Sequence, residues 1–142
     1  MHIGVLGLNH RSTPVDLRER VAFQAGQVPA ALESVRRELG IQECVILSTC
    51  NRVELYALLP EVDGHADRLQ RFLAQFHRLP AGHLNNHTYW YLQPDSVRHL
   101  FRVAAGLDSM VLGGAGILGQ VREAYGQAVS CGGAGSVFHR LF

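Results

Sequence analysis

The stretch STCNR, residues 48–52, joins two segments that have the sequence character of β-strands. The segment before it, residues 44–47, is apolar and partly β-branched, which is typical of a buried strand. The segment after it alternates polar with apolar residues from Arg52 onward. That period predicts a half-buried strand with Arg52 and Glu54 on the same face. The turn between the two strands would carry Cys50.

Cys50 has two interpretations at this position. A thiolate, not a thiol, is the nucleophile, and a nearby fixed cation favours it. Cys50 beside Arg52 therefore fits a nucleophilic cysteine next to an arginine that recognises an anion. An ordinary buried cysteine at a strand end also fits, since free cysteine is among the most buried residue types. The residues alone leave both interpretations open.

Size and composition favour one soluble globular domain. The chain has 142 residues, of which 47% are hydrophobic and 18% charged. It has no apolar run of bilayer length and no basic leader, so we expect a cytoplasmic protein without a membrane partner. All thirteen basic residues are arginine, which excludes lysine Schiff-base chemistry and a phosphate-loop lysine. Three cysteines without Cys-x-x-Cys spacing favour neither a disulfide framework nor a structural zinc site, so we expect no metal.

The pattern along the whole chain predicts four strands with helices between them. We expect an α+β fold, a ferredoxin-like split βαβ unit with a four-stranded antiparallel sheet and additional helices, covered on one face. The predicted helix that opens at Pro94 has an apolar stripe of Val97, Leu100, Phe101 and Ala104. The predicted strands cover residues 2–9, 44–47, 52–59 and 87–92. The other predicted helices cover residues 14–22, 28–39, 65–78 and 117–130.

Three further features are candidates for function. His99 lies beside that apolar stripe, so it either faces a cleft as a proton carrier or is a partly exposed helix residue; His10 is a weaker candidate. Asp108 and Ser109, between glycines, either face a ligand or make local turns. Residues 114–119 match the dinucleotide fingerprint by letter. They lack its usual context of a strand before and an acidic residue after, so a loop that caps a helix is the better account.

Four segments together resemble the N-terminal catalytic domain of the glutamyl-tRNA reductase family. They occur in order and without large gaps over nearly the whole chain, and the cysteine and Gly-Leu-Asp-Ser motifs are distinctive. The resemblance suggests a catalytic domain over residues 1–135 and the start of a truncated connecting helix over 136–142. The matching segments are NHRSTP with LRE (9–14 and 17–19), STCNRVE (48–54), GLDSMVLG (106–113) and ILGQV (117–121).

The resemblance implies a reaction. A cysteine attacks the ester of glutamyl-tRNA, releases the tRNA and holds a thioester, which NADPH reduces to glutamate-1-semialdehyde for tetrapyrrole synthesis. Carried onto this sequence, it makes Cys50 the nucleophile and His99 the active-site histidine. NADPH would bind a domain absent from this chain, and full-length members form homodimers through a C-terminal domain. The implied substrate-binding residues are Thr49, Arg52, Glu54 and Ser109.

Two departures from the family keep a second function open. The chain ends at Phe142, before the cofactor domain, so we expect no complete reduction from it alone. The family has Glu-Pro-Gln where this chain has Gly114-Ala115-Gly116, which removes two polar groups and loosens the loop. A non-catalytic module that binds tRNA or protein is therefore the alternative to the enzyme domain, and an unrelated thiol hydrolase is a third reading.

Overall fold

The computed structural model describes residues 1–142 except 62, 81 and 109–115. Its strands form one sheet in the order β2-β3-β1-β4, and each neighbouring pair is antiparallel. The strands are β1 (His2–Asn9), β2 (Cys44–Ser48), β3 (Arg52–Leu59) and β4 (Tyr89–Leu92). The helices are α1 (Val15–Val21), the short 3₁₀ helix η1 (Ala25–Gln27), α2 (Val28–Leu39), α3 (His65–Phe76), α4 (Asp95–Ala104), α5 (Ile117–Ser130) and α6 (Ser136–Leu141).

The strand order confirms the predicted split βαβ architecture. The chain runs from β1 through α1 and α2 to β2, and the hairpin partner β3 then inserts between β1 and β2. After α3, β4 pairs with the other side of β1. The two central strands, β1 and β3, therefore carry the residues that contact both layers of helices.

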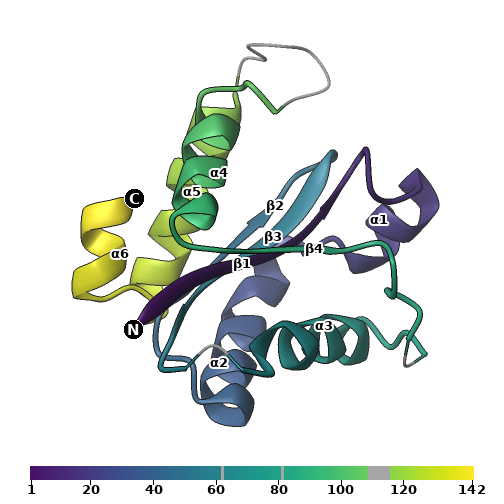
Figure 1. Ribbon diagram of the computed structural model, residues 1–142, viewed down its shortest axis with the longest axis horizontal. Coiled ribbons are helices and arrows are strands. Elements are labelled where there is room, and N and C mark those ends of the chain that lie inside the picture. Colours follow the sequence, from purple (N-terminus) through teal and green to yellow (C-terminus); the bar gives the residue numbers. More distant parts are fainter. Residues whose placement is uncertain (62, 81, 109–115) are drawn as a thin grey trace.

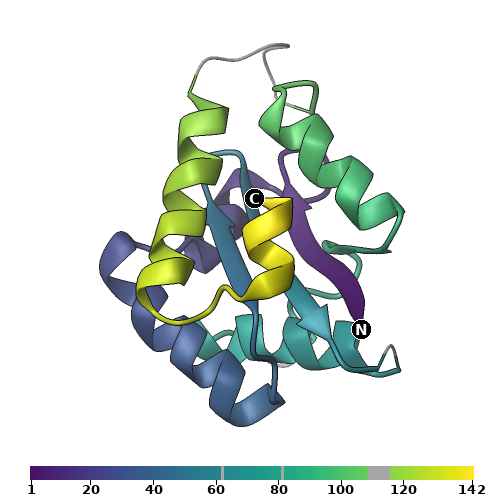
Figure 2. The same cartoon turned by 90° about the vertical axis from the view of Figure 1, so that its left-hand side faces the viewer.

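Helices cover both faces of the sheet, so the expectation of one covered face was wrong. Helices α2 and α3 lie on one side of the sheet, α4 and α6 lie on the opposite side, and α5 runs beside the edge strand β2 (Figures 1 and 2). All eight residues of β3 are buried. The alternation of β3 was correct, but its polar side faces a second layer of protein and not water.

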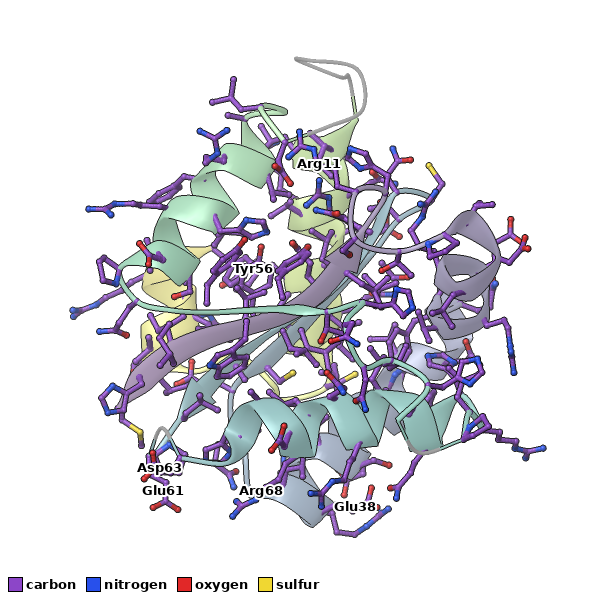
Figure 3. All side chains as sticks on the ribbon, turned by 45° about the vertical axis from the view of Figure 1, so that its right-hand side comes forward. Arg11, Glu38, Tyr56, Glu61, Asp63 and Arg68 are labelled. Atoms are coloured by element: carbon purple, nitrogen blue, oxygen red, sulfur yellow. The ribbon has the colours of Figure 1, made fainter. Side chains whose placement is uncertain are left out.

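The sheet face that packs against α4 is consequently both polar and buried. It carries Arg52, Glu54 and Tyr56, whose side chains are at most 2% exposed. In Figure 3, Tyr56 lies in the interior of the molecule, whereas Arg11 lies near the top edge of the view. A buried charge is costly unless it is paired, so the neighbours of this face determine what it can do.

The side of α4 that packs against the sheet differs from the side predicted from its apolar residues. Its buried residues are Ser96, Leu100 and Val103, while Phe101 is 59% exposed. His99 lies between the buried positions at helical spacing and so faces inward. None of the described helices combines the length and the apolar character needed to cross a bilayer.

Helix α6 is fixed to the rest of the chain by a buried carboxylate. Glu43 accepts hydrogen bonds from the backbone N–H groups of Gly135 (2.8 Å) and Phe138 (2.9 Å), at the start of this helix. The Phe138 side chain is fully buried. The proposed division of the chain at residue 135 stays a prediction, although residues 136–142 do form a helix up to Leu141.

Candidate active site

The hairpin between β2 and β3 presents Cys50 to solvent. The backbone N–H of Thr49 donates to the carbonyl of Arg52 (2.8 Å), and the N–H of Asn51 donates to the Thr49 hydroxyl (3.1 Å). These bonds close a tight turn that leaves Cys50 exposed, so the interpretation as a buried cysteine was wrong. Cys44, by contrast, is buried, and burial raises the pKa of its thiol to about 12.

Arg52 points away from that turn into the interior. Its Nη2 donates to the Asp108 carboxylate (2.9 Å) and to the Asp108 carbonyl (2.6 Å), and its Nη1 donates to Glu54 (3.3 Å). Asp108 also accepts a hydrogen bond from the exposed Arg11 (2.9 Å). Two guanidinium groups therefore share one carboxylate, which ties the segment after α4 to the second strand of the hairpin, β3, and to the loop after β1.

Glu54 is the centre of the buried network. Its carboxylate accepts hydrogen bonds from the hydroxyls of Tyr56 (2.7 Å) and Tyr89 (2.5 Å) and contacts Nε2 of His99. An ionised carboxylate only accepts, so His99 donates from Nε2. In a neutral imidazole, Nδ1 would then be the acceptor. Glu54 thus fixes both the orientation of His99 and the position of its proton.

The charges of this network stabilise one another against burial. Burial raises the pKa of Glu54, but the hydrogen bond and charge of His99, with Arg52, outweigh it and hold that pKa below its ordinary value. Burial likewise raises the pKa of Asp108, and Arg52 and Arg11 reverse the effect. For Arg52, burial lowers the pKa of the guanidinium, but Glu54, Tyr89 and Asp108 together more than offset it. Both carboxylates are therefore ionised at neutral pH.

We expect acid to destabilise the fold through these two carboxylates. Their pKa values are lower in the folded chain than in the unfolded one, so their contribution is present above the ordinary carboxyl pKa of about 4. It is lost as the pH falls through the folded-state values. Urea unfolding should show a lower midpoint at about pH 3 than at about pH 7. Equal midpoints at the two pH values would contradict the assignment.

Gly7 makes the approach of Tyr89 to Glu54 possible. A Cβ on Gly7 would lie 2.7–2.8 Å from the Tyr89 ring and hydroxyl. We expect Gly7→Ala to displace the ring, break its hydrogen bond to Glu54 and lower the free energy of unfolding by about 1–3 kcal/mol. Gly26→Ala is the matched control, because a Cβ there has open space and should change stability by less than about 1 kcal/mol. Urea unfolding of both variants measures the difference; equal effects would remove the steric argument.

A pocket of about 440 Å³ lies over this network. Asn9, which lines it, pairs with Arg52 in the sheet register, and two residues of chain span at most about 7 Å. The exposed Cys50 therefore lies at the same end of the sheet as the pocket. The remaining lining residues are Arg11, Ser12, Tyr89, Tyr91, Asp95, Arg98, His99, Arg102 and Asp108.

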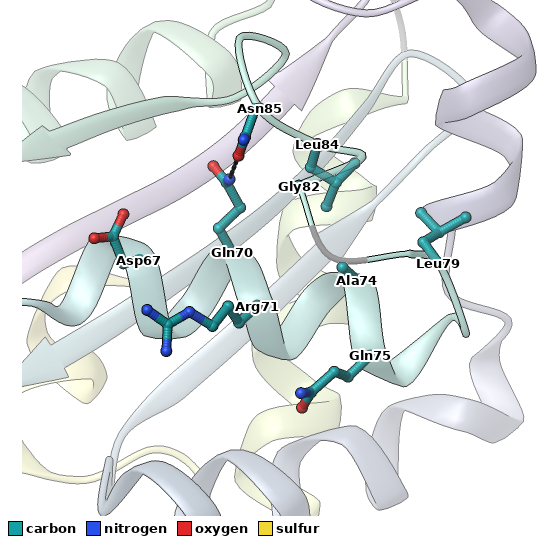
Figure 4. Close-up of a pocket in the computed structure, with 9 residues that line it drawn as sticks. All are labelled: Asp67, Gln70, Arg71, Ala74, Gln75, Leu79, Gly82, Leu84 and Asn85. Carbon is teal, nitrogen blue, oxygen red and sulfur yellow. Dashed lines mark hydrogen bonds between the residues drawn. The ribbon is translucent and has the colours of Figure 1, made fainter.

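A second pocket lies against α3, which is on the opposite side of the sheet from α4. It has a volume of about 460 Å³, and the loop at Asn85 forms one side of it, with Gln70 donating to the Asn85 side chain (2.8 Å; Figure 4). Its lining contains no cysteine or histidine among the described residues. Nor do the described residues contain a group of three His, Cys, Asp or Glu side chains that could hold a metal ion. The pocket next to the hairpin is the better candidate for chemistry.

The structure brings together several residues that the sequence singled out and adds others. Arg52, Glu54 and His99 lie in one network, and Thr49 forms the turn that presents Cys50. Ser109 lies outside the described residues, as do Gly114 and Ala115. Sequence reasoning missed the roles of Tyr56, Tyr89, Arg11, Arg98 and Arg102. One available signal was Gly7, a glycine inside a strand, which often marks the close approach of another group.

Comparison with known proteins gives the family. A family model described as glutamyl-tRNA(Glu) reductase, N-terminal domain, matches residues 6–142. The chain belongs to this family. The glutamyl-tRNA reductases of Rubrobacter xylanophilus and Aromatoleum aromaticum are 49% and 45% identical to it over 142 residues, and the match covers 100% of this chain and 33% of each relative.

The solved structures agree with the glutamyl-tRNA reductase assignment. Glutamyl-tRNA reductase from Methanopyrus kandleri superposes with a TM-score of 0.79 at 28% identity, over 98% of this chain and 31% of that one. The chain thus spans about a third of the length of the curated reductases it matches. The fold and the family are shared with these longer proteins.

Proposed function

We propose that this chain captures the glutamyl group of glutamyl-tRNA on Cys50. The observation that carries the proposal is the exposed thiol on the β2–β3 turn, at the sheet end that also holds the arginine-lined pocket. A thiolate converts one difficult acyl transfer into two easier steps. The named activity of the relatives, reduction of glutamyl-tRNA, supports a glutamyl ester as the substrate.

The proposed step is an acyl transfer from the ribose oxygen of the tRNA to the Cys50 sulfur. The Cys50 sulfur attacks the ester carbonyl carbon, a C–S bond forms, and the bond from that carbon to the ribose oxygen breaks. The thiol proton leaves and the departing ribose oxygen gains one, so the products are a glutamyl thioester and tRNA with a free hydroxyl. We assign the proton transfer to His99, which Glu54 holds through Nε2.

The structure gives different kinds of support to the other residues that the family resemblance implies as substrate-binding. Substrate contact by Thr49, Arg52, Glu54 and Ser109 stays a prediction. Glu54 is fully buried among protein donors, which supports a positioning role through His99. The Arg52 donors reach Asp108 and Glu54, which supports a role in holding the pocket wall. A cytoplasmic location and homodimers of the full-length proteins are likewise retained as proposals.

Reduction of the thioester would need NADPH, which supplies hydride when bound. Dinucleotide binding of the glycine-fingerprint type needs parallel strands joined through a helix. The described strands pair only in antiparallel fashion, and the segment before the fingerprint lies outside the described residues. The described residues do not fit the cofactor, and we propose that a further domain supplies it.

A trapping experiment tests the capture step. The chain is incubated with tRNA carrying labelled glutamate and then denatured in acid, and we expect a labelled, hydroxylamine-sensitive adduct that peptide mass spectrometry locates at Cys50. Tight tRNA binding with no adduct would instead favour a non-catalytic binding module. The Gly114-Ala115-Gly116 segment motivates that second function, because it lacks the family's Glu-Pro-Gln.

A further inference from the structure

Tyr91 places an open aromatic ring on the pocket surface. It is 37% exposed, and its ring stacks on Tyr89 with 5.4 Å between centroids and 27° between planes. The centroid of the His99 ring lies 5.2 Å from that of the Tyr91 ring. Tyr89 and His99 are both fixed by hydrogen bonds to Glu54. Because the Tyr91 ring packs against these two rings, it is held in position as well. An aromatic ring that is held by its neighbours but open to solvent is suited to stacking on a planar group.

Helix α4 places two arginines beside that ring. Arg98 and Arg102 lie one helical turn apart, line the same pocket and are both exposed. Arg98 pairs only loosely with Asp95 (3.4 Å), with both side chains more than two-thirds exposed, so this pair leaves the guanidinium accessible. Arginine binds phosphate through two donors at once. The pocket therefore combines a stacking ring with a site for a phosphate.

The position of Cys50 limits what could occupy this part of the pocket. The ester of an aminoacyl-tRNA is on the ribose of its last nucleotide, so the last base lies one sugar away from the reacting carbonyl. A pocket of about 440 Å³ is within the usual range for a small ligand, and it lies at the sheet end that carries Cys50. The two cations would also suit the glutamyl carboxylate, but a flat ring suits a base and not an aliphatic chain, so the ring and the cations together match a nucleotide.

We propose that Tyr91, Arg98 and Arg102 form a subsite for the 3′-terminal nucleotide of the RNA, with the base on Tyr91 and its phosphate on the two arginines. The assignment rests on the proposed function, because it takes the acylated RNA end as the group that reaches Cys50. It adds a recognition surface on β4 and α4 to the hairpin that carries the thiol.

Two RNA probes test the base contact. One is an RNA hairpin that ends in CCA and carries no amino acid. The other is the same hairpin with an abasic last nucleotide, which keeps the sugar and the phosphate. We expect the chain to bind the first about tenfold more tightly, since stacking on an aromatic ring has an effect of this order. Tyr91→Leu should bind both probes equally. Phe101→Leu, an exposed aromatic residue of α4 outside this pocket, should keep the preference.

The arginines have a separate readout. The double variant Arg98→Gln, Arg102→Gln should weaken binding of both probes and make the affinity less dependent on salt, because fewer phosphate contacts release fewer counterions. Arg37→Gln, on the exposed side of α2, should change neither quantity. Circular dichroism shows whether each variant is folded.

The outcomes separate this proposal from the proposed function. A wild-type chain that binds the two probes equally, or a Tyr91→Leu variant that keeps the preference, overturns the subsite even where the Cys50 adduct forms. A tenfold preference that depends on Tyr91 supports the subsite, and if no adduct forms in the same preparation, the capture step alone is rejected.

Discussion

Cys50→Ser should lose the labelled glutamyl adduct almost completely. Removal of a nucleophile that carries a covalent step costs on the order of a thousandfold in rate or more. A serine hydroxyl keeps the shape of the side chain but remains protonated at neutral pH, when a cysteine is already partly thiolate. The rate of adduct formation from labelled glutamyl-tRNA, measured by acid quench, gives the comparison.

The other cysteines provide matched controls for this experiment. Cys131→Ser should form the adduct at the wild-type rate, because Cys131 lies in the turn after α5 and outside the pocket. Cys44 is buried in the core with a pKa of about 12 and should carry no label in any variant. An equal adduct on Cys50→Ser would reject Cys50 as the nucleophile.

Glu54→Ala should produce the largest loss of stability. The change leaves the Arg52 charge buried with a single carboxylate partner and removes the acceptor for two tyrosine hydroxyls and for His99. Breaking a buried ion pair by removing one partner typically lowers the free energy of unfolding by about 3–5 kcal/mol. Urea unfolding at neutral pH measures this, and the slope of the transition shows whether it remains two-state.

Glu33→Ala is the matched control for a carboxylate outside the network. Glu33 pairs with Arg36 (3.2 Å) on the surface of α2, with its side chain 56% exposed. Exposed pairs of this kind contribute at most about 1 kcal/mol, so we expect a small change. If Glu54→Ala destabilised the chain no more than Glu33→Ala, the buried network would not be a stabilising unit.

Local pattern was enough to predict the elements of the fold. The predicted helix over 28–39 and its end at Gly40 agree with α2, because Gly40 adopts the left-handed conformation (φ 68°) that favours glycine at a helix end. The strand over 2–9 and the helix over 117–130 also agree with β1 and α5. These features depend on neighbours within a few residues, and the sequence displays those neighbours directly.

The arrangement of side chains around Glu54 could not be read in the same way. Arg52 and Asp108 are 56 residues apart in sequence, and no local period connects them. The rotation of α4 likewise depends on a contact between His99 and a strand 45 residues earlier. The buried face of α4 includes Ser96, whose hydroxyl donates to the Ile3 carbonyl (2.8 Å), so apolar residues alone gave the wrong side.

Under the proposed function, the tight turn that carries Cys50 would separate the reacting group from the surface that selects the substrate. The Cys50 thiol is exposed on the hairpin, and the described lining of the neighbouring pocket does not include Cys50. Under the proposed capture by Cys50, selection among esters would fall to the surface that anchors the incoming molecule. Such a division would let the anchoring surface vary without a change in the position of the thiol.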